Sequence, residues 1–117
     1  MATGILYTGT LTSTTATTAY VVPSTTYSVV NVSFTNTGTS AATIRLYIGA
    51  SLGPAGSVTG SLVPSEAIEY DTTIAPKGVF ERTGLVLSSV SGAKYITVYA
   101  STGNVNVNIY GIETSTV

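Results

Sequence analysis

The sequence predicts an all-β protein, an antiparallel β-sandwich of jelly-roll type with about eight strands. Hydrophobic residues make up 44% of the chain and charged residues only 8%, which favours an ordered, packed domain. Abundant Thr, Val, Ile and Tyr favour pleated strands, and no segment shows a helical period. Turn residues recur every 8–12 positions or so, a spacing typical of sandwiches and barrels. We expect one domain over residues 1–117.

The expected strands are runs of strand-forming residues separated by Gly, Pro, Asn and Ser. In chain order they are Ile5–Thr12, Thr18–Val22, Tyr27–Asn36, Thr43–Gly49, Val58–Val63, Ala67–Thr73, Val79–Leu87, Lys94–Ser101 and Val105–Ile112. We expect one or two of these runs to merge or to be absent. The Thr-rich N-terminal segment, residues 1–26, is also a candidate for an extended arm over a neighbouring subunit.

Alternation of apolar and polar residues assigns a buried and an exposed face to two strands. The side chains expected in the core are Val30, Val32, Phe34, Ala42, Ile44, Leu46 and Ile48. Those expected outside are Asn31, Ser33, Thr35, Thr43, Arg45 and Tyr47. Each sheet should therefore bury one face and expose the other.

The last two strands are expected to form a hairpin that reverses around Thr102 and Gly103. In this register all their aliphatic side chains share one side, with Val98 opposite Val107. The other side is a candidate interface, because Tyr is enriched and charge is depleted in subunit contacts. It consists of Tyr95, Thr97, Tyr99, Asn106, Asn108 and Tyr110. The alternatives for this side are an ordinary exposed sheet face and a contact with a glycan.

Six of the chain's charged residues lie in one stretch, Glu66–Arg82. Pro76 and Gly78 occupy the second and fourth positions of a predicted type I turn, which would make the stretch a hairpin. Reversal there places Asp71 directly opposite Arg82, an ion pair that would set the register.

Composition excludes several chemistries. The chain has no Cys and no His, so thiolate sites, Ser-His-Asp triads and the usual zinc sites are absent. A net charge of −1 and four scattered basic residues argue against nucleic acid and anionic membranes as partners. The first residues lack the basic and apolar regions of a signal peptide, and Met1 suggests a complete chain.

Two reactive sites in the charged stretch are conceivable from the residue types, and the sequence disfavours both. Glu66, Glu69 and Asp71 could hold Ca²⁺, but the stretch has no calcium-binding loop and Asp71 already has a predicted partner. Glu81 with Glu69 or Asp71 could form a paired-carboxylate hydrolase site, but the sequence indicates no cleft. We expect no metal, no cofactor and no catalytic residue.

Several segments together resemble a small β-domain found in virion proteins of tailed bacteriophages. They are Asn36–Leu46, Ile68–Thr73, Pro76 with Gly78–Leu87, and Val105–Glu113. The family occurs in capsid-decorating, tail and fibre components, and the resemblance attaches no catalytic role to these residues. It implies a non-enzymatic building block located in the virion.

Within that resemblance, the favoured role is a capsid decoration or cement protein that contacts the major capsid protein or other virion subunits. The alternatives are a tail or fibre component, or a carbohydrate-binding module that reads host glycans through the Tyr face. The low charge favours a permanent homo-oligomer, with a trimer as the guess, because free monomers rely on surface charge to resist association.

Overall fold

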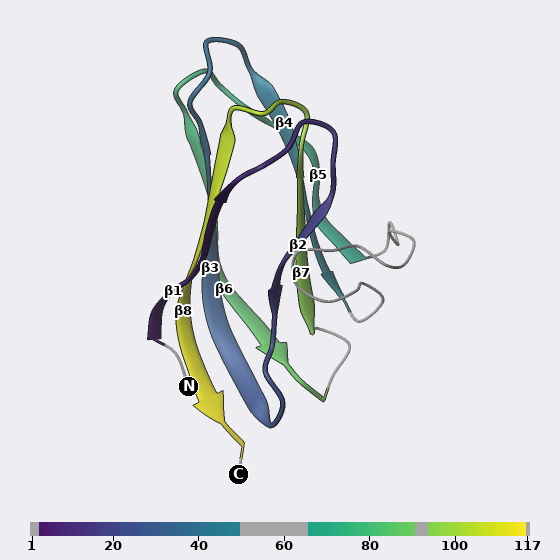
Figure 1. The fold of residues 1–117 in the computed structure, drawn as a ribbon, viewed down its shortest axis with the longest axis vertical. Helices are drawn as coiled ribbons and strands as arrows, with labels where there is room; N and C mark the ends of the chain where they lie inside the picture. Colours follow the sequence, from purple (N-terminus) through teal and green to yellow (C-terminus); the bar gives the residue numbers. More distant parts are fainter. Residues whose placement is uncertain (1–2, 50–65, 91–93, 117) are drawn as a thin grey trace.

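The chain folds into two four-stranded sheets that pack face to face as a β-sandwich (Figure 1). This is a computed structural model, and it describes residues 3–49, 66–90 and 94–116. The strands are β1 (Thr3–Thr10), β2 (Thr17–Val21), β3 (Thr26–Asn36), β4 (Ala42–Gly49), β5 (Ala67–Ile74), β6 (Val79–Ser88), β7 (Tyr95–Ala100) and β8 (Val105–Ser115). The predicted all-β class and antiparallel sandwich are confirmed. The predicted strand Val58–Val63 lies outside the described residues.

The strands are ordered β1-β8-β3-β6 in one sheet, here called sheet A, and β2-β7-β4-β5 in the other, sheet B. All the pairings within both sheets are antiparallel. Consecutive strands lie in different sheets, except β4 and β5, which pair with each other in sheet B. The chain therefore crosses the sandwich at most of its turns.

The hairpin predicted for the last two strands is wrong. β7 pairs with β2 and β4, whereas β8 pairs with β1 and β3. The predicted sides of both strands are nevertheless right as far as Ile109, since the aliphatic residues up to that point are fully buried: Ile96, Val98, Ala100, Val105, Val107 and Ile109. Ile112, farther along β8, is the exception at 54% exposed. Alternation predicts which side chains face the core. It does not distinguish a hairpin from a connection that crosses between the sheets, because the same side chains are buried in both arrangements.

The core lies between the two sheets and follows the predicted alternation closely. Val30, Val32 and Phe34 of β3 are completely buried, as are Ile44 and Leu46 of β4. Tyr47 differs from the prediction, because it was expected outside and is only 2% exposed. Its neighbour across the β4–β7 pairing, Thr97, is also fully buried. Alternation gives the side of a sheet but not whether that side is open to water.

The Thr-rich N-terminal segment is part of the sandwich, so the predicted arm is wrong over the described residues of that segment. β1 pairs with β8, and β2 pairs with β7. Leu11, Ala19 and Val22 are buried in the core between the sheets. These apolar residues and the strand pairings together hold the segment in the sandwich, although the Thr-rich composition around them conceals the pattern.

A turn does lie at the predicted Pro76–Gly78 position, but it joins two sheets. The Gly78 amide donates to the Ala75 carbonyl at 2.9 Å, which closes a four-residue turn. Lys77 has a φ of 60°, which excludes the predicted type I and fits type II, where the third residue has positive φ. Since β5 belongs to sheet B and β6 to sheet A, the expected hairpin is replaced by a crossing.

Asn36, at the end of β3, ties together the loops around this turn. Its side-chain amide donates to the carbonyls of Ser40 (2.8 Å), Ile74 (3.2 Å) and Ala75 (3.3 Å). Its side-chain oxygen accepts from the Gly38 amide at 3.0 Å. Asn36 is completely buried, so these bonds replace the water that its amide group loses on folding.

A buried hydroxyl and a buried carboxylate link the two sheets at another point. The Tyr20 hydroxyl of β2 donates to Glu113 Oε2 of β8 at 2.5 Å and lies 2.7 Å from Ser28 Oγ of β3. Burial, together with the hydrogen bond to Glu113, raises the pKa of Tyr20 well above its ordinary value. Loss of the phenolic proton is therefore strongly disfavoured in the folded state.

Replacing Tyr20 with Phe is expected to lower the free energy of unfolding by about 2 kcal/mol at neutral pH, because a hydrogen bond to a charged group is lost. The raised folded pKa means that this tyrosine's stabilisation is complete below about pH 10, its unfolded pKa, and declines as the pH rises further. Urea unfolding at neutral pH and above pH 10 should show that the free energy of unfolding declines less with pH in Tyr20→Phe than in the wild type.

Candidate functional site: the outer faces of the two sheets

The six residues predicted to form one interface lie on two opposite faces of the sandwich. Tyr95, Thr97 and Tyr99 belong to β7 in sheet B. Asn106, Asn108 and Tyr110 belong to β8 in sheet A. The prediction of a single continuous patch is therefore wrong, for the same reason that the hairpin is wrong.

The sheet B half of the predicted interface is only partly open. Thr97 is fully buried, and its hydroxyl lies 3.3 Å from that of Thr18. The Lys94 amine lies 5.7 Å from the centre of the Tyr95 ring, within the range of a cation–π contact. Thr97 thus has a structural role, and the accessible part of this face is centred on Tyr99.

Tyr99 belongs to a cluster built around Arg45 of β4. The guanidinium carbon lies 4.3 Å from the ring centre of Tyr70 and 4.6 Å from that of Tyr99. Arg45 also donates two hydrogen bonds to the Asp71 carboxylate, from Nε at 2.7 Å and from Nη2 at 3.3 Å. These bonds are the main reason that the pKa of Arg45 is raised above its ordinary value. The cluster holds a charge flat against two aromatic rings.

An irregularity in β5 places Tyr70 and Asp71 for this cluster. The β4–β5 register shifts between Ile44 and Leu46, opposite this part of β5. Asp71 has a φ of 54°, the left-handed conformation that occurs in some β-bulges. The extra residue allows the Tyr70 ring and the neighbouring carboxylate both to reach Arg45.

The predicted ion pair between Asp71 and Arg82 is wrong, and each residue has another partner. Asp71 pairs with Arg45, and Arg82 Nη1 donates to Glu69 Oε2 at 2.6 Å. Arg82 lies opposite the buried Val32 in sheet A, so its side chain points inward and reaches Glu69 in sheet B. The pair therefore links the two sheets at the edges formed by β5 and β6. Asp71 and Arg82 do not lie opposite each other, because β5 and β6 belong to different sheets and are not paired.

The carboxylates weighed as reactive groups are not assembled into one site. Glu69 also accepts from the Thr72 hydroxyl at 2.8 Å. Glu81 lies on sheet A and accepts a hydrogen bond from the Tyr110 hydroxyl, which raises the pKa of Tyr110. The described residues contain no group of three acidic, His or Cys side chains placed to bind a metal ion. Asp71, Glu69 and Glu81 instead form ion pairs and hydrogen bonds with neighbouring side chains.

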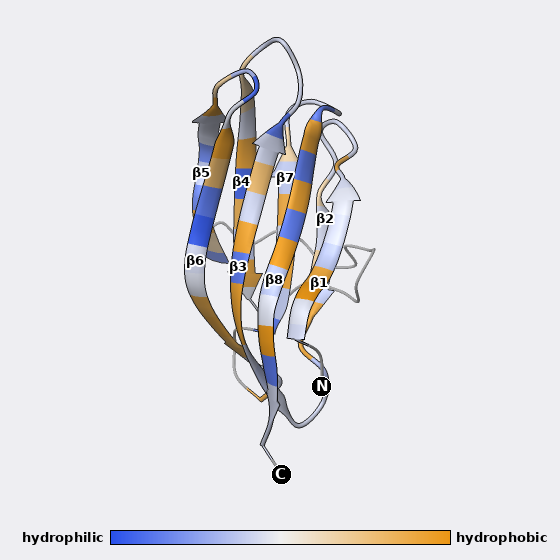
Figure 2. Cartoon of the chain, turned by 90° about the vertical axis from the view of Figure 1, so that its left-hand side faces the viewer, coloured by the Kyte–Doolittle hydropathy of each residue, from blue (hydrophilic) through white to orange (hydrophobic). Residues whose placement is uncertain are grey.

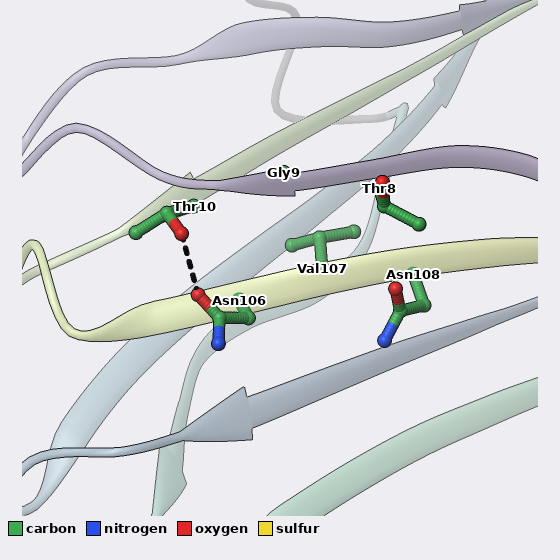
Figure 3. Close-up of a pocket in the computed structure, with 6 residues that line it drawn as sticks. All are labelled: Thr8, Gly9, Thr10, Asn106, Val107 and Asn108. Carbon is green, nitrogen blue, oxygen red and sulfur yellow. Dashed lines mark hydrogen bonds between the residues drawn. The ribbon is translucent and has the colours of Figure 1, made fainter.

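Two residues of the sheet A half of the predicted interface, Asn106 and Asn108, line a shallow polar depression of about 310 Å³. It is lined by Thr8, Gly9, Thr10, Asn106, Val107 and Asn108, as Figure 3 shows. The Thr10 hydroxyl donates to Asn106 Oδ1 at 2.7 Å. Two residues farther along β8, Asn108 lies on the same side (Figure 3). Hydroxyl and amide groups on an open sheet face suit a hydrogen-bonded contact with another protein surface.

The other half of the same face is apolar, and sequence reasoning did not identify it. The apolar patch consists of Ile5, Tyr27, Val29, Val86 and Ile112, which are between 40% and 65% exposed. Val29 on β3 is paired on one side with Val86 of β6 and on the other with Ile112 of β8. Figure 2 shows this outer face, with hydrophobic bands toward the lower end of its strands.

A signal for the apolar patch was present in the sequence. Val29 and Tyr27 continue the outward side of Asn31 in steps of two, and Ile112 continues that of Tyr110. Their exposure therefore follows from alternation along each strand. Their position beside one another and beside Val86 follows only from the observed strand pairing.

No protein-family model and no curated protein matches this chain. The resemblance to a phage virion domain therefore remains a prediction from the sequence. Among the described residues, no helix is long and apolar enough to cross a membrane.

Proposed function

We propose that this chain is a non-enzymatic structural protein of a tailed-phage virion, with capsid decoration as the favoured role. Its partners in this proposal are the major capsid protein or other virion subunits, together with further copies of the chain. It would stabilise the shell by burying surface across joints between subunits. A tail or fibre position is the alternative within the same class.

The observation that carries the proposal is the apolar patch in a surface that is poor in charge. Soluble monomers seldom expose large continuous apolar surfaces, and such surfaces usually mark contacts with other proteins. Here Val29, Val86 and Ile112 form a row across three neighbouring strands. With charged residues at 8% of the chain, little surrounding charge is present to keep copies apart.

The strand order supports the jelly-roll type within this proposal. Eight strands in two sheets, with nearly every connection crossing between the sheets, fit a double-sheet jelly roll. Jelly rolls occur in viral capsid proteins and also in lectins. Because one fold hosts many functions, the order supports the virion proposal but does not carry it.

A glycan-reading role has less support on sheet B. Tyr99 was the residue favoured for stacking against a sugar, and one face of its ring is covered by the Arg45 guanidinium. Its partner in the cluster, Tyr70, is 57% exposed, but the same guanidinium lies over one face of its ring. A sugar platform usually needs ring faces that are open and arranged along a groove.

The test is a binding experiment with purified phage parts. The full chain should add to heads of the phage that encodes it in a saturable, stoichiometric manner, measured by co-sedimentation, and should raise the temperature at which the heads release DNA. Saturable binding to tails alone would move the protein to the tail. Binding to neither, with glycan binding that is lost in Tyr99→Ala, would overturn the virion proposal.

A further inference from the structure

The apolar patch occupies one half of a face that carries almost no charge. Glu81 is the only charged side chain that the four described strands of sheet A turn outward. Arg82 points inward opposite Val32, and Glu113 is buried. We infer that this face binds a second copy of the chain, sheet against sheet, about a twofold axis. The inference deepens the proposed assembly function and rests on it.

The size of the face fits a stable dimer. Four strands about 4.8 Å apart, with a central strand of roughly 36 Å, give a face of about 600 Å² on each copy. A standard protein interface buries about 800 Å² per partner, whereas crystal-packing contacts bury less than about 400 Å². The apolar patch would form the dry centre of such an interface, and the Thr and Asn residues of the depression would form part of its polar rim.

The charge pattern favours a second copy over a charged partner. A strongly basic surface would find only Glu81 as a counterpart on the outward side of the described strands of sheet A, and a strongly acidic surface would find none. A second copy brings the same nearly neutral face, so no unpaired charge is buried at the centre. The Tyr110 hydroxyl already binds Glu81 within each copy, which satisfies part of that charge before association.

The position of the patch favours twofold symmetry. Val29 lies on an inner strand, and an apolar residue flanks it on each side. A twofold axis along β3 through Val29 places Val86 of one copy opposite Ile112 of the other. A threefold ring would instead need two different complementary surfaces on each copy. The structure therefore favours a dimer on this face over the trimer guessed from the sequence.

The first test compares two equally exposed valines on β6. Val86 is 65% exposed within the patch, and Val79 is 64% exposed at the other end of the strand, roughly 20 Å away. Sedimentation velocity of the full chain over a range of concentrations should show a dimer that dissociates on dilution. Val86→Lys should raise the dimer dissociation constant at least about 100-fold, because a charge enters the dry centre. Val79→Lys, which lies opposite Thr35 at the polar end of the same face and so at the rim of the interface, should change it by less than about threefold.

The second test uses charges to report the symmetry. In the double variant Val86→Lys/Ile112→Glu, each introduced lysine would face the introduced glutamate of the other copy. In Val86→Lys/Ile112→Lys, like charges would face each other. The first double variant should therefore dimerise at least about 100-fold more tightly than the second. Circular dichroism and thermal melting would show that both variants are folded.

The outcomes separate the dimer from the proposed virion role. A wild-type chain that stays monomeric but saturates phage heads would overturn the dimer and leave the capsid function standing. A dimer that binds no phage part would overturn the virion proposal alone. Equal losses in Val86→Lys and Val79→Lys would overturn the location of the interface. Equal affinities of the two double variants would overturn the twofold axis along β3.

Discussion

Replacing Gly111 with Ala is expected to lower the free energy of unfolding by more than about 3 kcal/mol, a large part of a small domain's stability. A Cβ at this position would lie 2.1 Å from the Val29 carbonyl oxygen and 2.7 Å from the Val30 α-carbon. Both atoms belong to the backbone of β3, which is paired with β8 on one side and β6 on the other. β3 cannot move away without breaking one of these pairings.

The melting temperature of Gly111→Ala should fall by about 12 °C or more in a circular dichroism scan. Gly103→Ala is the matched control, because the nearest atom to its added Cβ, the Leu11 carbonyl oxygen, would be 3.9 Å away. That variant should melt within about 2 °C of the wild type. A Gly111→Ala protein that melts as high as the Gly103→Ala protein would contradict the close approach of β8 to β3.

The sequence correctly predicted which side of a strand faces the core, but it did not predict which strand lies beside it in the sheet. Val98 and Val107 were predicted to be buried, and both are fully buried. They were also predicted to pair, and they lie in different sheets. A short turn between two alternating strands is compatible with a hairpin and with a crossing between sheets. Only the packing of the whole chain decides between these arrangements, because it determines which edges are already occupied.

The same limit explains the errors in the candidate site. Asp71 was assigned to Arg82 because a hairpin would oppose them, whereas the β4–β5 pairing brings Asp71 to Arg45. Tyr99 meets Arg45 because the two residues are directly paired between β7 and β4. Such contacts join residues far apart in the sequence, and local alternation contains no information about them.

The segments that carry the family resemblance meet at one end of the sandwich. The backbone amide of Asn36 donates to the Gly78 carbonyl at 2.9 Å, which joins the end of β3 to the Pro76–Gly78 turn. The Thr37 amide donates to the Asn104 carbonyl at 2.8 Å, just before β8 begins. The ends of these segments therefore share one structural junction.

Replacing Asn36 with Asp is expected to lower the free energy of unfolding by about 4 kcal/mol at neutral pH. The two side chains have nearly the same shape, but the amide nitrogen that donates to Ser40, Ile74 and Ala75 becomes a carboxylate oxygen. That oxygen would face three carbonyl oxygens in a fully buried site. Only the bond from the Gly38 amide would be kept.

The pH dependence of Asn36→Asp separates charge from shape. Burial among carbonyl oxygens would raise the folded pKa of the new carboxyl above its unfolded value of about 3.9. The protonated form can donate a hydrogen bond, so the variant should be closest to the wild type below about pH 4 and should lose stability as the pH rises through the folded pKa. Urea unfolding at pH 3 and pH 7 measures this difference. Asn104→Asp, at an exposed turn residue, should lose less than about 0.5 kcal/mol at either pH. A deficit in Asn36→Asp that is equal at both pH values would show that the buried charge is not its cause.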